Sequence, residues 1–205
     1  YGRGMLLRMA RGPLGEGDLR EALEEIVAQV GRADRIIQNV RSLARKRQAA
    51  VRAIGINDTI TANQAVFRLL ASSTGVRIEL QPDPQQPIVT ADPVQIEQVL
   101  VNLVKNAVDA SAALPPEQRV VTVRSRGLED GRVSIEVEDR APMPPAEIFE
   151  RIGEPFFTTK AEGLGLGLSI TRTLLEYHGT RLAIRPGPDC GKIFHFELER
   201  ATNGG

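Results

Sequence analysis

Three alternating glycines mark the stretch of this sequence best suited to chemistry. Gly163, Gly165 and Gly167 alternate with leucines, and the apolar run Leu168–Leu175 that follows them predicts a helix. Backbone without a Cβ can approach an anion closely, and the first N–H groups of a helix have no partner within it. The run therefore predicts a phosphate site at a helix N-terminus, with an ordinary turn as the competing interpretation.

Two asparagines form the second candidate. Asn102 and Asn106 share one face of a helix that is predicted from Asp92, with Pro93 at its first position, to about Ser111. Amide oxygens are hard ligands that suit Mg²⁺, which keeps most of its waters and also binds substrate phosphates. Taken without other motifs, the two amides are better explained as a solvated helix face.

The composition argues against several other functions. The 205 residues carry 26 basic and 26 acidic side chains, a balance that disfavours a general nucleic-acid binder. The only cysteine, Cys190, allows no internal disulfide and suits a reducing compartment, and two histidines are too few for a typical zinc cluster. No apolar run reaches the length of a membrane span. We expect a cytoplasmic protein, attached to a membrane, if at all, through segments upstream of Tyr1.

The elements that would position these residues predict an α+β fold. A helix capped by Asn57 or Asp58 is expected to run to about Ser73, and a second helix, from Leu168, is expected to end at His178-Gly179. The predicted strands are Val76–Leu80, Ile88–Thr90, Val120–Arg126, Val133–Glu138, Arg181–Arg185 and Ile193–Glu199. This order predicts a two-layer α/β sandwich, with a mixed sheet and its helices on one face.

The stretch between the two halves of this fold is expected to be a long loop. Residues 139–166 are rich in Pro and Gly and lack strong periodicity. A loop of this length within a compact domain usually has a function, often as a lid.

The N-terminal region predicts a coiled coil. Asp18 is expected to cap a long helix, with Glu21 as its capping-box partner. Apolar residues fall at alternating spacings of four and three, at Leu19, Leu23, Ile26, Val30, Ala33, Ile37, Val40 and Ala44. This pattern favours an α-helical hairpin that dimerises as a four-helix bundle over a helix that packs on its own domain. The expected organisation is a hairpin over residues 1–50, a second domain over 51–200 and a tail over 201–205.

The motifs stand in an order that resembles a known family. They are QVLVNLVKNAVDA (Gln98–Ala110), Asp139 at the end of a strand, EPFFTTK (Glu154–Lys160) and GLGLGLSI (Gly163–Ile170). They resemble the boxes of the catalytic, ATP-binding domain of sensor histidine kinases, in the superfamily of gyrase, heat-shock chaperones and mismatch-repair ATPases. The resemblance covers about residues 57–199, and the N-terminal region is similar to part of the family's dimerisation and phosphotransfer hairpin.

This resemblance implies a kinase core that binds Mg-ATP. The γ-phosphate would pass to a histidine on the hairpin and then to an aspartate of a response regulator. Asn106 would hold Mg²⁺ with Asn102 in support, and Asp139 would accept from the adenine amino group. The implied nucleotide-binding residues are Asn102, Lys105, Asn106, Asp139, Lys160, Gly163, Leu164, Gly165, Leu166, Gly167 and Leu168. The implied partners are ATP or ADP, a second copy in a homodimer through the hairpin, and a response-regulator receiver domain.

The roles of three further residues follow from the same resemblance. Lys105 would face phosphate, and a solvent-facing lysine is an equally good interpretation. Phe156 and Phe157 are expected to anchor the lid by packing on the domain.

The sequence departs from the family pattern in two places. The first glycine box, usually Asp-x-Gly-x-Gly, reads Asp139-Arg140-Ala141-Pro142-Met143 here, which predicts weakened nucleotide binding. Neither His178 nor His195 matches the phosphoacceptor, which is expected upstream of Tyr1, so no catalytic residue is assigned within this chain.

These departures keep two alternatives open. The first is a degenerate, non-catalytic relative that dimerises and acts as a regulatory or docking module. The second, an ATPase clamp of the gyrase or chaperone type, is disfavoured because it needs a water-activating glutamate where Asn102 stands.

Overall fold

The computed structural model describes residues 17–21, 23–27, 30, 50–160 and 165–201. Its backbone separates into two units, residues 1–45 and 46–205. In the first unit, residues 17–21, 23–27 and 30 are helical, as predicted. Gly17 already belongs to the helix, so the prediction that Asp18 is the residue before the helix is wrong. The predicted apolar positions Ala33, Ile37, Val40 and Ala44 lie outside the described residues.

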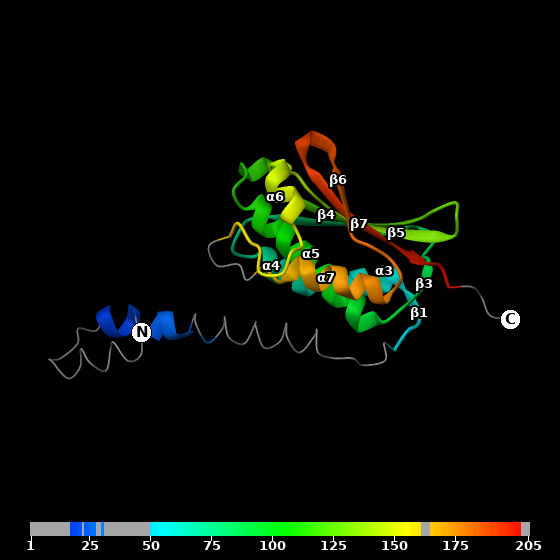
Figure 1. Ribbon diagram of the computed structural model, residues 1–205, viewed down its shortest axis with the longest axis horizontal. Helices are drawn as coiled ribbons and strands as arrows, with labels where there is room; N and C mark the ends of the chain where they lie inside the picture. Colours follow the sequence, from blue (N-terminus) through cyan, green and yellow to red (C-terminus); the bar gives the residue numbers. More distant parts are fainter. Residues whose placement is uncertain (1–16, 22, 28–29, 31–49, 161–164, 202–205) are drawn as a thin grey trace. The chain divides into compact units, whose positions relative to one another are not determined.

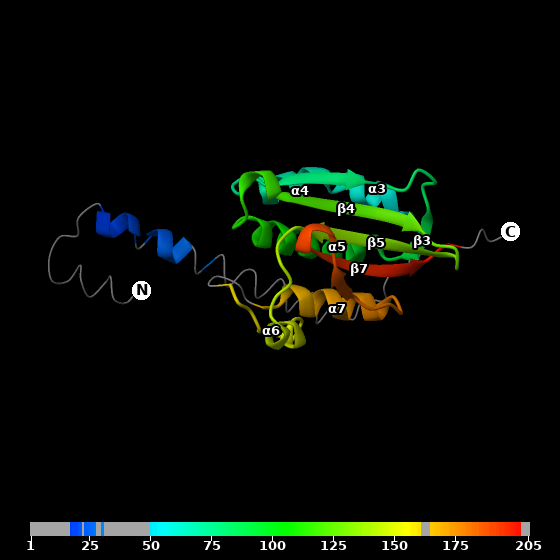
Figure 2. The ribbon, with the colours of Figure 1, turned by 90° about the horizontal axis from the view of Figure 1, so that it is seen from above.

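A mixed sheet forms one layer of the second unit. Within its described residues, five strands pair in the order β2-β4-β5-β7-β6. These strands are β2 (Arg77–Gln81), β4 (Val120–Gly127), β5 (Arg132–Asp139), β6 (Ala183–Pro186) and β7 (Lys192–Glu199). Strand β2 runs parallel to β4, whereas all the other neighbours in this sheet are antiparallel, as Figure 2 shows for β4, β5 and β7.

A smaller pair of strands stands beside the main sheet. β1 (Arg52–Gly55) pairs antiparallel with β3 (Ile88–Ala91). Val89 of β3 forms a bridge to Arg200, which directly follows β7. The pair therefore connects the start of the second unit with its last strand.

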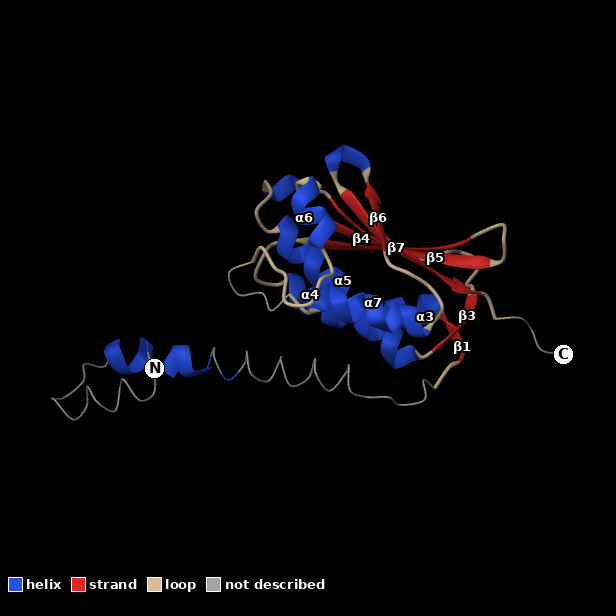
Figure 3. Ribbon diagram, in the orientation of Figure 1, coloured by secondary structure: helices blue, strands red, loops and turns tan. Residues whose placement is uncertain are grey.

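The helices form the second layer, on one face of the sheet (Figures 1 and 3). They are α3 (Ile56–Ala62), α4 (Gln64–Ala71), α5 (Pro93–Ser111) and α7 (Gly167–Tyr177). A short helix, α6 (Ala146–Arg151), lies between β5 and α7 in the sequence, and single 3₁₀ turns occupy Pro116–Gln118 and Pro188–Cys190. The arrangement confirms the predicted two-layer sandwich. None of the described helices combines the length and apolar character that a membrane span requires.

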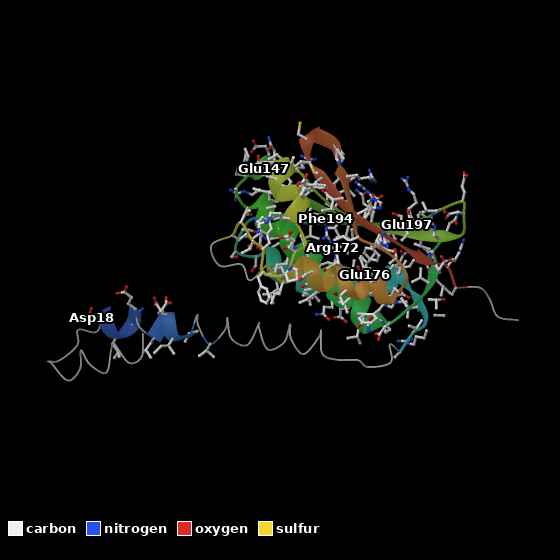
Figure 4. The ribbon with its side chains drawn as sticks, viewed as in Figure 1. Asp18, Glu147, Arg172, Glu176, Phe194 and Glu197 are labelled. Atoms are coloured by element: carbon white, nitrogen blue, oxygen red, sulfur yellow. The ribbon has the colours of Figure 1, made fainter. Side chains whose placement is uncertain are left out.

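The core lies between these layers because each element has one apolar face. In β5 and β7 the buried side chains alternate and meet in register, so that Val137 pairs with Phe194 and Ile135 with Phe196. Phe194 is labelled on β7 in Figure 4. Helix α5 supplies the opposite side at helical spacing, with Ile96, Val99, Leu100, Leu103, Val104, Ala107 and Val108 buried.

Several predicted boundaries are confirmed. Helix α5 begins at Pro93, and Asp92 caps it by accepting hydrogen bonds from the backbone N–H groups of Val94 (2.9 Å) and Gln95 (3.4 Å). Helix α7 ends at Tyr177, and Gly179 follows with a φ of +69°. Both predicted hairpins, β4–β5 and β6–β7, are present.

Four predictions are wrong in detail. The single helix expected up to Ser73 is divided into α3 and α4 at Asn63, whose Nδ2 donates to the carbonyl of Thr59 at 2.9 Å. A side chain that bonds locally to the backbone competes with helix continuation. Neither Asn57 nor Asp58 caps the helix, because α3 already begins at Ile56 and has no side-chain cap. The amide of Asn57 bonds to Asp83 and Ser125 instead. The other two errors are missed elements: β1, and α6 within the expected loop.

The Asp92 cap can be tested through stability. Asp92 also accepts from the backbone N–H of Ala50 at 3.0 Å, so its carboxylate holds both the start of α5 and the incoming chain. We expect Asp92→Ala to lower the free energy of unfolding by about 1 kcal/mol or more, as for other lost helix caps. Urea unfolding measures this, with Glu97→Ala on the exposed side of α5 as the control. Equal stability of the two variants would contradict the role of the cap.

Candidate functional site

The two asparagines of α5 face the start of α7. The Nδ2 of Asn102 lies 3.5 Å from the carbonyl oxygen of Gly167. A Cβ added to Gly167 would lie 3.8 Å from the Nδ2 of Asn106. The structure thus brings together two motifs separated by about sixty residues, and the two asparagines are half-buried between them.

The start of α7 has the features of an anion site. Gly165 has a φ of +66°, and a Cβ at this position would collide with the backbone of Phe156 and Phe157, so that only glycine fits. Leu166 precedes the helix and is buried, and in the described part of the chain no side chain caps α7. The first N–H groups of α7 therefore remain available to an anion. Two residues predicted for this site, Gly163 and Leu164, lie outside the described residues.

A cluster of charged side chains lies beside Asn106. Lys160 reaches from the segment before the glycines, and its Nζ lies 2.8 Å from Asp109 Oδ2 and 3.4 Å from Asn106 Oδ1. Lys105 lies 3.2 Å from the same Asp109 oxygen. Partial burial acts to raise the pKa of Asp109, but the two ammonium groups outweigh it and hold that pKa below its usual value. Lys160 and Lys105 thus share Asp109 as their ion-pair partner.

The segment that carries Lys160 has a close contact with α7 and a cation–π contact within itself. The Arg172 guanidinium on α7 (Figure 4) lies so close to Gly153 that a Cβ there would collide with it. Arg151 stacks over Phe157, 4.0 Å from the ring centroid. Phe156 is 74% exposed, so the prediction that it packs on the domain is wrong.

Asp139 stands at the other end of the site, at the close of β5. Its side chain is fully buried, and its Oδ1 accepts from the backbone N–H of Ala141 at 2.9 Å and from Lys192 Nζ at 2.7 Å. Burial raises the pKa of the Asp139 carboxyl above its usual value, and the Lys192 ammonium opposes that rise. Lys160 also opposes that rise, more weakly than Lys192.

The second oxygen of Asp139 points to a ligand. Asp139 Oδ2 is buried and has no hydrogen-bond partner among the described residues. A buried acceptor is normally satisfied, because leaving one without a donor costs about 1–3 kcal/mol. An exocyclic amino group of a nucleobase is a donor of the required kind. The residues present therefore fit an adenine nucleotide, with its base at Asp139 and its phosphates at α7.

The divergent first glycine box adopts an unstrained backbone. Neither Ala141 nor Met143 has a positive φ, so the replacement of glycine at these positions causes no backbone strain. Gly191 allows the backbone just before β7 to lie close to the backbone of Asp139. A Cβ on Gly191 would collide with the carbonyl oxygen of Asp139.

Three residues of the site, Gly191, Lys192 and Asp109, are absent from the sequence-based prediction. A signal for Lys192 exists in the sequence. In KIFHFELE, Lys192 shares its alternation with Phe194, Phe196 and Leu198, which places a charge at a core-facing position. Asp109 carries no such signal, because its importance comes from Lys160, fifty-one residues away.

The histidines and other potential metal ligands show no second centre. His178 follows the last residue of α7 and burial lowers its pKa, which fits the structural role predicted for it. In the described ranges, no three His, Cys, Asp or Glu side chains gather in a group that could hold a metal. Any metal at this site would depend on the amide of Asn106 and on ligand oxygens, as is usual for Mg²⁺.

Comparison with known proteins agrees with this geometry. Residues 91–202 match the family described as "Histidine kinase-, DNA gyrase B-, and HSP90-like ATPase". The sensor protein TdiS of Thauera aromatica is 31% identical over 185 residues, which cover 90% of this chain and 34% of TdiS. The chain thus spans about a third of the length of this relative.

Solved structures of histidine kinases share the fold. The nucleotide-free catalytic domain of histidine kinase ThkA is 30% identical, with a TM-score of 0.63 over 73% of this chain and 95% of that one. A complex of ThkA with the response regulator protein TrrA matches at 26% identity and a TM-score of 0.77, over 97% of this chain and 56% of that chain. With the matched family covering more than half of its residues, the chain belongs to the histidine kinase-, DNA gyrase B- and HSP90-like ATPase family and contains the ATP-binding domain of a sensor histidine kinase.

Proposed function

We propose that this chain is the kinase core of a two-component sensor, which binds Mg-ATP and donates its γ-phosphoryl group to a histidine. The phosphorus–oxygen bond to ADP breaks, a bond to an imidazole nitrogen forms, and the phosphoryl group then passes to an aspartate of a response regulator. The observation that carries ATP binding is the buried Oδ2 of Asp139, which lacks a donor among the described residues. ATP supplies the donor as its 6-amino group.

At the phosphate end, each residue is assigned a role from its position. Asn106 holds Mg²⁺ through Oδ1, the atom that accepts a weak bond from Lys160 in this structure. Lys160 and Lys105 supply positive charge to the phosphates, and the N-terminus of α7 supplies N–H groups. A magnesium ion held there would offset the negative charge of the phosphates.

The side chain of Asn102 favours phosphoryl transfer over ATP hydrolysis. An amide cannot take a proton from water as a carboxylate does. The Nδ2 of Asn102 is directed to the carbonyl of Gly167, so this residue joins α5 to α7. A site without a water-activating base keeps ATP for transfer to a side chain.

The exposed apolar face of the N-terminal helix supports a homodimer, whose helical bundle would carry the acceptor histidine. Leu19, Leu23 and Val30 are 45%, 53% and 63% exposed, although their spacing is that of a coiled coil. A second copy that contributes the same face would bury these side chains in a four-helix bundle. We place the response-regulator contact in the same assembly, by analogy with the ThkA–TrrA complex.

A non-catalytic relative is the second candidate, and the sequence Arg140–Met143 favours it. Met143 is half-buried and stands where the family has a glycine, so its side chain would take up space beside the adenine and weaken binding. ATP binding by the complete sensor without labelling of any histidine would favour this regulatory or docking module over a kinase.

Base selectivity tests the role of Asp139. We expect ATP to bind the 205-residue chain roughly tenfold or more tightly than purine riboside triphosphate, which lacks the 6-amino group, because a buried acceptor would remain unpaired. Titration calorimetry measures both dissociation constants. Equal affinities would contradict the assignment, and an ordinary micromolar constant for ATP would contradict the expected weakening by Met143.

The magnesium role of Asn106 predicts a specific loss. Asn106→Ala should remove most of the gain in ATP affinity that Mg²⁺ confers, roughly tenfold or more, the scale known for disturbed metal sites. Calorimetry with Mg²⁺ and with a chelator separates this loss from metal-free binding. Glu97→Ala on the same helix is the matched control, and an unchanged Mg²⁺ effect in Asn106→Ala would refute the role.

The histidines give a third test. Incubation of this chain with radiolabelled ATP should leave His178 and His195 without acid-labile label, because one follows a helix end and the other lies in the sheet. Peptide mapping after the reaction locates any label. Acid-labile label on either residue would show that the acceptor assignment is mistaken.

A further inference from the structure

A buried lysine lies next to the carboxylate that is proposed to read the base. Lys192 begins β7, and the strand register places it directly opposite Asp139. Its side chain is 10% exposed and that of Asp139 0%. Besides Asp139 Oδ1, its Nζ donates to the carbonyl oxygen of Ala141 at 3.3 Å. A lysine is rarely so buried unless it is paired, and here its partner is the central residue of the adenine end.

The pairing distinguishes the two carboxylate oxygens. Oδ1 accepts from both Lys192 Nζ and the N–H of Ala141, whereas Oδ2 has no partner among the described residues. Rotation of the carboxylate would break two hydrogen bonds, one of them to a charged group. Oδ2 is therefore the oxygen left for a donor from outside the protein.

Lys192 also organises the divergent segment after β5. Its ammonium bonds both to Asp139 and, two residues on, to the Ala141 carbonyl. Gly191 beside it allows the backbone of β7 to approach Asp139 and Arg140. Residues 139–141 are thus held from the neighbouring strand, in a chain whose first box lacks glycines.

We propose that Lys192 is a positioning residue for nucleotide binding, which keeps the Asp139 carboxylate charged and oriented so that Oδ2 accepts from the base. This inference rests on the proposed function. Lys192 is not needed to contact the nucleotide, and its effect is transmitted through Asp139.

The charges around Asp139 determine which measurement would detect this role of Lys192. Burial is the largest influence on Asp139 and raises its pKa, and the cations that oppose it are Lys192 from β7 and, more weakly, Lys160 from the segment before α7. From β4, the register partner of Asp139 is the apolar Val121. Because ATP needs the charged carboxylate, its affinity is highest above this pKa and falls as the pH drops through it. Loss of Lys192 raises the pKa further, so the fall begins at a higher pH.

The test is a pH profile of ATP affinity for the wild type and for Lys192→Met. The wild-type chain and both variants are titrated with ATP and with purine riboside triphosphate between about pH 5 and about pH 8, where a raised carboxyl pKa would show. Arg185→Met is the matched control. It removes a cation from the same sheet, but Arg185 is paired with Glu136 at the exposed surface.

For Lys192→Met we expect the pH midpoint of ATP binding to lie higher than in the wild type. Near neutral pH its affinity for ATP should be lower than that of the wild type by roughly tenfold or more, because a charge-assisted hydrogen bond is lost. The profile of purine riboside triphosphate should not move, and Arg185→Met should match the wild type. Lys192→Gln, which keeps an N–H donor without the charge, is the second variant if Lys192→Met does not fold. The pH midpoint of ATP binding by Lys192→Gln should also be higher than that of the wild type.

Two contrary results have different meanings. ATP binding by folded Lys192 variants with the wild-type midpoint and affinity would overturn the role of Lys192 alone, since a purely structural lysine alters stability and not the pH profile. Failure of the wild-type chain to bind ATP at any pH would overturn the proposed function, and this inference with it.

Discussion

The pairing of β5 with β7 is the constraint on which the site depends. Alternate apolar side chains of the two strands face the helices, and the same alternation continues to Asp139 and Lys192 at one end. A slip of one residue would turn every side chain of a strand to the opposite face. The apolar pairs therefore fix the register, and the register brings the two charges together. A buried ion pair gives little net stability, but loss of one partner is costly. The core thus determines the position of the Asp139 carboxylate.

Much of the fold follows from local patterns in the sequence. The Asp92-Pro93 start of α5, the β4–β5 hairpin and the glycine after α7 each have a specific chemical signal, and each is present. The errors lie where tertiary contacts decide. Asn57 is a good capping residue by type, yet its amide bonds to Asp83 and Ser125 across the fold. Strand β1 is four residues long, and its partner β3 lies more than thirty residues away, so no local pattern could indicate their pairing.

The residues of the site also divide into those that short sequence patterns predict and those that only tertiary contacts reveal. The asparagines and glycines could be predicted because their chemistry depends on residue type and short spacing. The contacts of Lys160 with Asp109 and of Lys192 with Asp139 join residues about fifty positions apart, and only the folded chain shows them. Even so, the alternation in β7 predicts a charge at a core-facing position, Lys192, once the strand has been assigned from the sequence. The absence of glycines in the first box leaves no backbone strain, because neither Ala141 nor Met143 has a positive φ.

Helix α5 gives the domain a mechanical property. Asp92 holds the backbone of Ala50, where the chain enters the domain, and Asn106 lies fourteen residues further along the same uninterrupted helix. At 1.5 Å per residue, the two points are about 21 Å apart on one stiff rod. Because a continuous helix is stiff, the spacing along α5 between the Asp92 cap and both Asn102 and Asn106 is fixed. The residue that fastens the backbone of Ala50 therefore belongs to the same rigid element as the two asparagines.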